Sequence, residues 1–271
     1  MTAPPRDPDA VTPSEIAPGV WWLEAGRGLL RSNVYFVRSG SSWVLIDAGS
    51  AKCGRAVRHA AAGLFGELSY PAAILLTHDH PDHAGSVKEL AEAWDCFVWV
   101  HPDELPLVLG DLSTFEQYPG PLDRWVVLPF MHLLGPKRTK TMLEQASFRD
   151  RARPFDPDRQ LPGLPGWEAI PTPGHTPGHT AFFRREDRVL ITGDAMVTLD
   201  LNSLSGALLG RQRVSGPPWY TTWDWQVSKR SAALLAELEP RVLAGGHGVP
   251  MSGPETPSRV RSFSDRFSRR T

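Results

Sequence analysis

The sequence predicts an α/β (α+β) fold in which two β-sheets pack face to face and helices cover their outer surfaces. Short strand-like runs and helix-like segments occur in both halves of the 271-residue chain, as such a layered arrangement requires. No segment repeats at a fixed period, so a repeat architecture is not indicated.

The first half of the chain begins with β-branched and aromatic runs separated by Gly- and Ser-rich turns, a pattern typical of an antiparallel meander. The Ala-rich stretch 53–66 ends in glycine and predicts a helix, and the apolar run 72–77 predicts a buried strand that ends at a polar loop. The other elements expected here are strands over 20–23, 33–37, 43–47 and 97–100 and a helix over 84–94.

The second half begins with a region, 102–165, that mixes short helical stretches with Pro, Gly and charge. We interpret it as a partly helical insertion and a candidate cover for a pocket. After it we expect strands over 167–171, 180–184, 188–192 and 241–244 and a helix over 222–239. A final helix carries Val260, Phe263 and Phe267 at helical spacing, with arginines on its other faces.

The bulk properties limit the possible partners. The formal charge is -1 at pH 7 with no long block of one sign, so nucleic acid is not expected as a substrate. No apolar run is long enough to cross a bilayer, so no membrane partner is expected either. A small molecule is the expected substrate, and the sequence does not report the oligomeric state.

Two further expectations concern the domain and its environment. The proline-rich segment 1–18 lacks the pattern of a secretory signal, so we expect a loose N-terminal tail followed by a single domain over 19–271. Cys53 and Cys96 lack paired Cys-x-x-Cys spacing, which argues against a disulfide framework or a thiolate zinc site. We therefore expect a reduced, cytoplasmic protein.

A cluster of histidines and aspartates directly follows the apolar run 72–77, in the segment His78-Asp79-His80-Pro81-Asp82-His83. Imidazole nitrogens and carboxylate oxygens are ligands of zinc and similar ions. In a loop with alternating side chains, His78 and His80 would point one way and Asp82 and His83 another, so one loop can contribute to two metal sites. The alternative is a polar loop with incidental histidines.

Three other fragments supply the same kinds of side chain after strand-like runs. His175 lies in a tight Pro- and Gly-containing turn, Asp194 follows the strand 188–192, and His247 lies among glycines after the strand 241–244. Each fragment is weak evidence alone. Together with the first cluster they supply seven ligands from four loops, which is how a scaffold gathers distant residues into one site.

The pattern His78-x-His80-x-Asp82-His83, followed by His175, Asp194 and His247, resembles the signature of the metallo-β-lactamase superfamily over residues 20–250. The resemblance implies a four-layer αββα metallo-β-lactamase sandwich with the site at one edge between the sheets. It also implies that His78, His80 and His175 bind a first metal, that Asp82, His83 and His247 bind a second, and that Asp194 bridges them. Two divalent ions are expected, zinc first, with iron or manganese as alternatives.

The expected function is metal-dependent hydrolysis of a small ester, lactone or thioester. Two adjacent dications lower the pKa of a bridging water enough to hold hydroxide at neutral pH, and each can polarise a substrate oxygen. We hypothesise that Asp82 is the catalytic residue, because a carboxylate beside the bridge can receive the proton of that hydroxide.

No branch of the superfamily is matched in full. Flavodiiron-type proteins usually have glutamate where His80 stands, true β-lactamases generally lack the bridging aspartate seen here as Asp194, and homoserine-lactone lactonases typically have tyrosine at the position of Val197. Classical glyoxalase II enzymes carry a further C-terminal region, whereas few residues follow His247. Two alternatives stay open: a mononuclear iron persulfide dioxygenase of the same fold, and a non-catalytic metal-binding protein.

Several other residues have a functional and an ordinary interpretation. Asp47 is similar to an aspartate that orients a ligand histidine in the family, and we favour that role over a plain turn residue. His179 and His101 are expected to be structural, and His59 and His132 to be surface or packing residues. Trp219, Tyr220 and Trp223 fit a substrate wall and a core cluster equally well.

Overall fold

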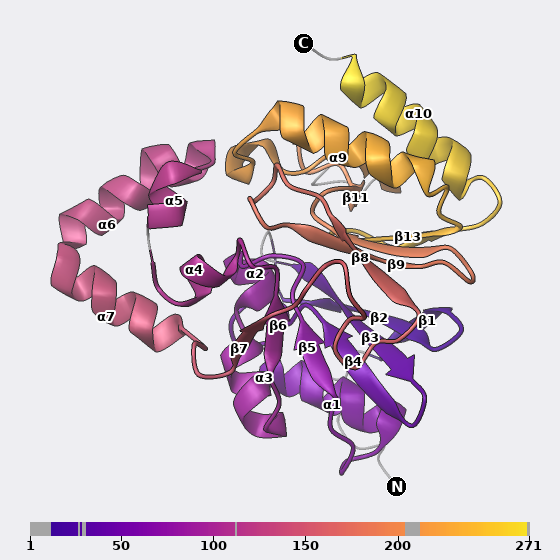
Figure 1. Cartoon of the computed structure of the whole chain (residues 1–271), viewed down its shortest axis with the longest axis horizontal. Coiled ribbons are helices and arrows are strands. Elements are labelled where there is room, and N and C mark those ends of the chain that lie inside the picture. The colour runs from indigo at the N-terminus through magenta and orange to yellow at the C-terminus, as the bar shows by residue number, and fades with distance from the viewer. Residues whose placement is uncertain (1–11, 27, 29–30, 112, 204–211, 270–271) are drawn as a thin grey trace, which may run out of the picture.

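The computed structural model describes residues 12–26, 28, 31–111, 113–203 and 212–269. Figure 1 shows two sheets that lie face to face between two helical layers. One outer layer contains α1 (Gly54–Phe65) and α3 (Val87–Trp94), and the other contains α9 (Trp225–Glu237) and α10 (Thr256–Ser268). The predicted αββα sandwich is therefore confirmed.

The first sheet has seven strands, which are hydrogen-bonded in sequence order. Its first four strands pair antiparallel, and the fourth to the seventh pair parallel. Gly40, with φ 60°, supplies the positive φ that the two-residue turn between the third and fourth strands favours. The strands are β1 (Ser14–Ala17), β2 (Val20–Ala25), β3 (Ser32–Ser39), β4 (Ser42–Ile46), β5 (Ala73–Leu75), β6 (Val98–Val100) and β7 (Ala152–Pro154).

The second sheet has five strands in the order β14-β13-β10-β9-β8. Only β10 and β13 pair parallel among these, and the other neighbours pair antiparallel. The strands are β8 (Trp167–Pro171), β9 (Thr180–Arg184), β10 (Val189–Gly193), β13 (Val242–Gly245) and β14 (Met251–Ser252). A separate two-stranded sheet joins β11 (Val197–Leu199) to β12 (Gln212–Ser215).

The central strands are buried on both faces. In β3, Phe36 belongs to the core under α1 and α3, whereas its neighbour Tyr35 belongs to the core between the sheets. In β10, Ile191 likewise faces the core between the sheets, and Leu190 faces α9 and α10. Because successive side chains of a strand point to opposite faces, each of these strands contributes apolar side chains to two cores.

The structure corrects three sequence-based expectations. Residues 14–17 form β1 instead of continuing a loose tail to residue 18, and they pair with β2; residues 1–11 lie outside the described part of the chain. The helix expected over 84–94 is shorter, because Gly85 and Ser86 separate α2 (Pro81–Ala84) from α3. The strands β7, β11, β12 and β14 were not expected, because runs of two to four residues show too little alternation.

The region 102–165 is partly helical. It contains α4 (Leu105–Val108), α5 (Ser113–Gln117), the π-helix η2 (Asp123–Val127), α6 (Leu128–Leu134) and α7 (Pro136–Ala146) before the chain returns to β7. Figure 1 shows α5, α6 and α7 beside the sandwich rather than over the outer face of either sheet. Within the described residues, no helix combines the length and apolar character needed to cross a membrane.

Trp43, which lies on β4 and packs against α1 and α3, supplies a test of this packing. Trp43 is 1% exposed, stacks on Phe65 with ring centroids 4.7 Å apart, and meets Trp94 edge-on at 5.3 Å. We expect Trp43→Ala to lower the free energy of unfolding by about 3–5 kcal/mol, because the variant loses buried apolar surface and also leaves a cavity. Denaturant titration measures this change.

The control for that variant is Leu68→Ala, which removes a side chain that is 87% exposed. It should change the free energy of unfolding by no more than about 0.5 kcal/mol. Equal losses in the two variants would contradict the packing described for Trp43.

Candidate metal centre

The predicted ligand residues lie at one edge of the sandwich, where strands of both sheets end. The carboxyl end of β5 leads to His78, that of β10 leads to Asp194, and that of β13 leads to His247. His175 lies in the turn between β8 and β9. Because Pro81 begins α2, Asp82 and His83 lie in a short helix and not, as expected, in one loop with His78 and His80. Pro at the first helical position costs no hydrogen bond and starts the turn.

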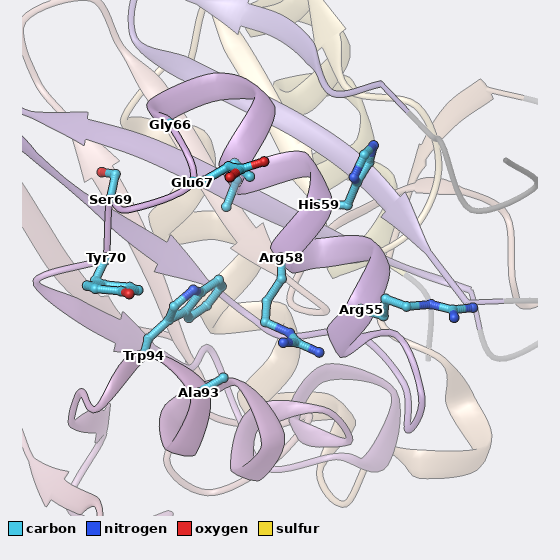
Figure 2. Close-up of a pocket in the computed structure, with 11 residues that line it drawn as sticks. Arg55, Arg58, His59, Gly66, Glu67, Ser69, Tyr70, Ala93 and Trp94 are labelled. Carbon is cyan, nitrogen blue, oxygen red and sulfur yellow. The ribbon is translucent and has the colours of Figure 1, made fainter. Parts of the chain in front are cut away.

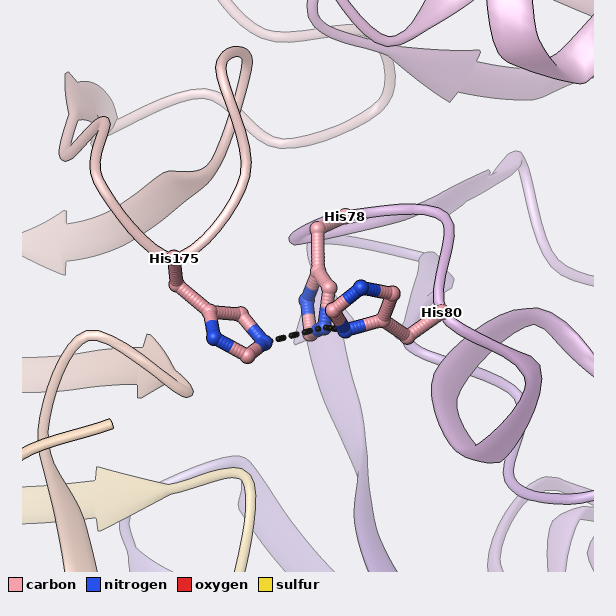
Figure 3. A group of neighbouring side chains, drawn as sticks. All are labelled: His78, His80 and His175. Atoms are coloured by element: carbon pink, nitrogen blue, oxygen red, sulfur yellow. Dashed lines mark hydrogen bonds between the residues drawn. The ribbon is translucent and has the colours of Figure 1, made fainter. Parts of the chain in front are cut away.

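His78, His80 and His175 form the first group of facing nitrogens (Figure 3). His78 Nε2 lies 3.0 Å from His80 Nδ1 and 3.2 Å from His175 Nε2. His78 and His175 are buried, and His80 is partly exposed. Three imidazole nitrogens that face one another at this spacing match the ligands of a zinc-like ion.

Asp82, His83 and His247 form the second group. Asp82 Oδ2 lies 3.3 Å from His247 Nε2 and 3.8 Å from His83 Nε2. Asp194 lies between the two groups: its Oδ1 is 3.4 Å from both His83 Nε2 and His247 Nε2, and its Oδ2 is 3.4 Å from His175 Nε2. The structure thus brings all seven predicted side chains together.

Two buried polar atoms of this cluster have no hydrogen-bond partner among the residues that the structure describes: Nε2 of His83 and Oδ1 of Asp194. Buried polar groups are normally paired, so an unpartnered nitrogen facing an unpartnered carboxylate oxygen requires an explanation. A divalent cation between them would accept both as ligands. Gly246 keeps this space open, because a Cβ there would lie 2.2 Å from Asp194 Oδ1.

The surroundings shift the pKa values of the cluster in opposite directions. Burial lowers the pKa of His78 and of His175, and neighbouring histidines add to the effect, so both imidazoles are neutral, as metal ligands must be. Burial also lowers the pKa of His247, but Asp194 and Asp82 outweigh it and raise the value to about 10. Burial raises the pKa of Asp194, but His247 and His83 hold it well below its ordinary range. The carboxylates of Asp82 and Asp194 therefore favour positive charge at His83 and His247.

Asp47, which follows β4, holds one of the second group's histidines in place. Its Oδ2 lies 2.8 Å from His83 Nδ1, and it accepts hydrogen bonds from the backbone N–H and the hydroxyl of Thr77. With Nδ1 turned toward a carboxylate, His83 presents Nε2 to the cluster. Asp47 thus makes the contact expected of an orienting aspartate.

Two histidines interpreted as structural make structural contacts. His179 lies outside the two ligand groups: its Nδ1 is 2.7 Å from Thr172 Oγ1, and its Nε2 accepts the backbone N–H of Asp194. It therefore positions the backbone of Asp194. His101 Nδ1 accepts the backbone N–H of Asp103 at the end of β6, which is a cap. His59 and His132 are exposed.

Sequence reasoning missed Glu104, which joins the two histidine-bearing segments. Its carboxylate is buried and accepts hydrogen bonds from the backbone N–H of Asp79, the hydroxyl of Thr176 and the backbone N–H of Gly178. Asp79 lies between His78 and His80, and Thr176 follows His175. No sequence motif points to Glu104. Its one distinguishing feature in the sequence is that it lies three residues after His101, just past the end of a strand.

Sequence reasoning also missed the residue that fixes the His247 loop from the opposite sheet. Asn33 in β3 donates from Nδ2 to the carbonyl oxygens of Gly245 and Gly248, at 2.8 and 2.6 Å. Tyr35 donates to the same Gly245 carbonyl at 2.6 Å. The first sheet therefore holds the loop that follows β13.

The insertion reaches the first ligand group. A small cavity of about 30 Å³ is lined by His80 and His175 together with Tyr118 and Asp123 from the insertion and Thr221 from η3 (Trp219–Thr221). The Tyr118 ring also meets that of Trp223 at 4.9 Å. Trp219 is 53% exposed, and Asp194 and Asp82 add to burial in raising the pKa of Tyr220. Tyr118 therefore borders the first ligand group, and Tyr220 is close enough to the carboxylates for its pKa to respond to them. Trp219 instead lines a separate cavity with Trp225 and Phe267.

A larger groove lies elsewhere in the molecule. It has a volume of about 540 Å³ and runs between α1 and α3, where Arg55, Arg58, Tyr70 and Trp94 are among the residues that line it (Figure 2). No member of the histidine cluster lines this groove. Chemistry at the cluster is therefore separate from it.

Comparison with known sequences gives matches over most of the chain. The model of the metallo-beta-lactamase superfamily matches residues 27–247. The probable metallo-hydrolase YflN of Bacillus subtilis (strain 168) is 36% identical over 242 residues, which cover 88% of each chain.

Two solved structures show similar architecture. The metallo-beta-lactamase family protein TTHA1429 from Thermus thermophilus has a TM-score of 0.64 and 23% identity, over 94% of this chain and 79% of its own. TTHA1623, crystallised in a di-iron-bound form, has a TM-score of 0.54 and 27% identity, over 85% of this chain and 94% of its own. With the family match over most of its length and the identity to YflN, the chain belongs to the metallo-beta-lactamase superfamily.

Proposed function

We propose that the chain is a binuclear metal-dependent hydrolase that cleaves a small ester, lactone or thioester. The proposal rests on the proximity of seven imidazole and carboxylate side chains. Among them, His83 Nε2 and Asp194 Oδ1 are buried and have no hydrogen-bond partner in the described part of the chain. The name of YflN, a probable metallo-hydrolase, supports the same reaction class.

In this proposal each group of side chains holds one divalent cation. His78, His80 and His175 hold the first, and Asp82, His83 and His247 hold the second; in each group the ligand atoms lie within 4.8 Å of one another. Asp194 would contact both cations, because one of its oxygens faces His175 and the other faces His83 and His247. Zinc suits this donor set, as do iron and manganese, and TTHA1623 has been crystallised with two irons.

The cations would lower the pKa of a bound water and polarise the carbonyl oxygen of the substrate. The chain itself supplies a proton acceptor, for which we propose Asp82. Its Oδ2 faces His247, and its side chain is 21% exposed, whereas that of Asp194 is 3% exposed. With Oδ2 held toward the cation site, the other oxygen of the Asp82 carboxylate would take up the proton and release it to water.

Two other functions make different demands on the same residues. A mononuclear iron dioxygenase needs only one ligand group, whereas here the ligand atoms of the second group also lie within 4.8 Å of one another. A non-catalytic metal-binding protein has no need of a partly exposed carboxylate at the cluster. Hydrolysis with two cations uses all seven side chains.

Metal content separates these functions. We expect the purified protein to hold two metal ions per chain by elemental analysis, and His175→Ala and His247→Ala each to lose about one, because each removes a ligand from a different group. His59→Ala, which changes an exposed histidine, is the control and should keep both. A panel of esters, lactones, thioesters and phosphodiesters then tests turnover.

Two other results of that experiment would favour the two other functions. One iron per chain together with thiol-dependent oxygen consumption would select the dioxygenase. Full metal content with no turnover of any member of the panel would select the non-catalytic protein.

Asp82→Asn tests the proton acceptor. We expect kcat to fall by about a hundredfold or more, because asparagine cannot take up a proton. Elemental analysis must first confirm that both metal ions are retained. Asp265→Asn, which changes an exposed aspartate in α10, should leave kcat unchanged. Full turnover by a fully loaded Asp82→Asn variant would remove Asp82 from this role.

Glu104→Gln tests the link between the two histidine-bearing segments. The amide can accept at one atom only, and its NH₂ group would face donors that now bind the carboxylate. We expect metal affinity to fall about 10- to 100-fold, as measured by competition with a chromophoric chelator. Unchanged affinity would show that the segments keep their positions without this carboxylate.

A further inference from the structure

The segment 122–144, which we name the helical arm, exposes an unusual amount of apolar surface. It comprises η2, α6 and most of α7, which lie beside the sandwich in Figure 1. Six of the thirteen large apolar side chains that are exposed in the described part of the chain belong to it. Exposed apolar residues are ordinary when scattered singly, but a contiguous set marks an interaction surface.

Five of these six side chains share one helical face. They stand at intervals of three, one, four and three residues, which is the spacing of one side of a continuous helix. The side chains of two of them are mostly exposed: Trp125 at 76% and Leu133 at 84%. The five are Leu122, Trp125, Val126, Phe130 and Leu133.

The charges on the arm are mostly positive. Four exposed basic residues occur in it, namely Arg124, Lys137, Arg138 and Lys140. Of its two acidic residues, Asp123 is buried, and Glu144 lies 3.9 Å from Lys140. The arm therefore combines an apolar face with a net positive charge.

We propose that the helical arm binds the surface of an anionic phospholipid bilayer. A helix with tryptophan, phenylalanine and leucine on one face and basic residues beside it lies in the plane of the membrane interface, with its apolar face inserted and its cations on lipid phosphates. The charge pattern favours this partner over a second copy of the chain, because a symmetric contact would bring the same cations together.

This proposal departs from the expectation that no membrane is a partner. That expectation rested on the absence of a spanning segment, and α6 and α7, with 7 and 11 residues, are indeed too short to span. Binding in the interface needs no spanning helix. It needs an exposed apolar face, and exposure is a property of the tertiary structure.

Vesicle sedimentation of the full-length protein tests the proposal without metal or substrate. We expect the protein to pellet with vesicles that contain phosphatidylglycerol, to remain in solution with vesicles of phosphatidylcholine alone, and to be released by salt. Trp125→Ser with Leu133→Ser should weaken binding about tenfold or more, because both side chains lose their apolar contact. Lys137→Glu with Arg138→Glu should weaken it by about tenfold.

The matched control is Leu68→Ser, which changes an exposed leucine outside the arm and should bind like the parent protein. All variants change exposed side chains, and unaltered thermal melting will confirm that they fold. Absence of binding, or equal binding to both kinds of vesicle, would overturn the proposal. So would a dimer that Trp125→Ser with Leu133→Ser converts to monomer while no vesicle is bound, because the face would then be a contact between copies.

Discussion

The buried carboxylate of Asp194 is the group on which the arrangement of the site depends. Asp194 is 2% exposed and lies between the two ligand groups. One of its oxygens has no hydrogen-bond partner among the described residues. Burying a carboxylate is costly unless opposite charge or hydrogen-bond donors surround it. The histidines provide that environment, and a pair of cations would complete it. The imidazoles around Asp194 must therefore be held in place by contacts with the rest of the fold.

The two sheets supply this rigidity from opposite sides. Asp47, at the end of β4, fixes His83, and Asn33 in β3 fixes the loop that carries His247 in the other sheet. Glu104 ties the loop after β5 to the turn between β8 and β9. Each contact joins segments that are distant in the sequence. The ligand atoms are thus positioned by regular secondary structure and by short buried hydrogen bonds.

The insertion has two parts with different environments. Its first part, which includes Tyr118, borders the small cavity at His80 and His175, and so does Asp123 at the start of the helical arm, so these residues belong to the wall of the site. Its second part, the helical arm, presents Trp125 and Leu133 to the outside. One segment therefore connects the region where chemistry is proposed with the surface where lipid binding is proposed.

The sequence by itself determined the layered fold, most central strands and helices, and all seven candidate ligands, because these depend on local periodicity and on residue type at strand ends. It could not determine that Glu104 and Asn33 hold the loops, because their partners lie up to 215 residues away. Nor could it show that residues 14–17 extend the first sheet or that Trp125 is exposed. An apolar residue at helical spacing looks the same in a core and on a surface, and only tertiary packing distinguishes them.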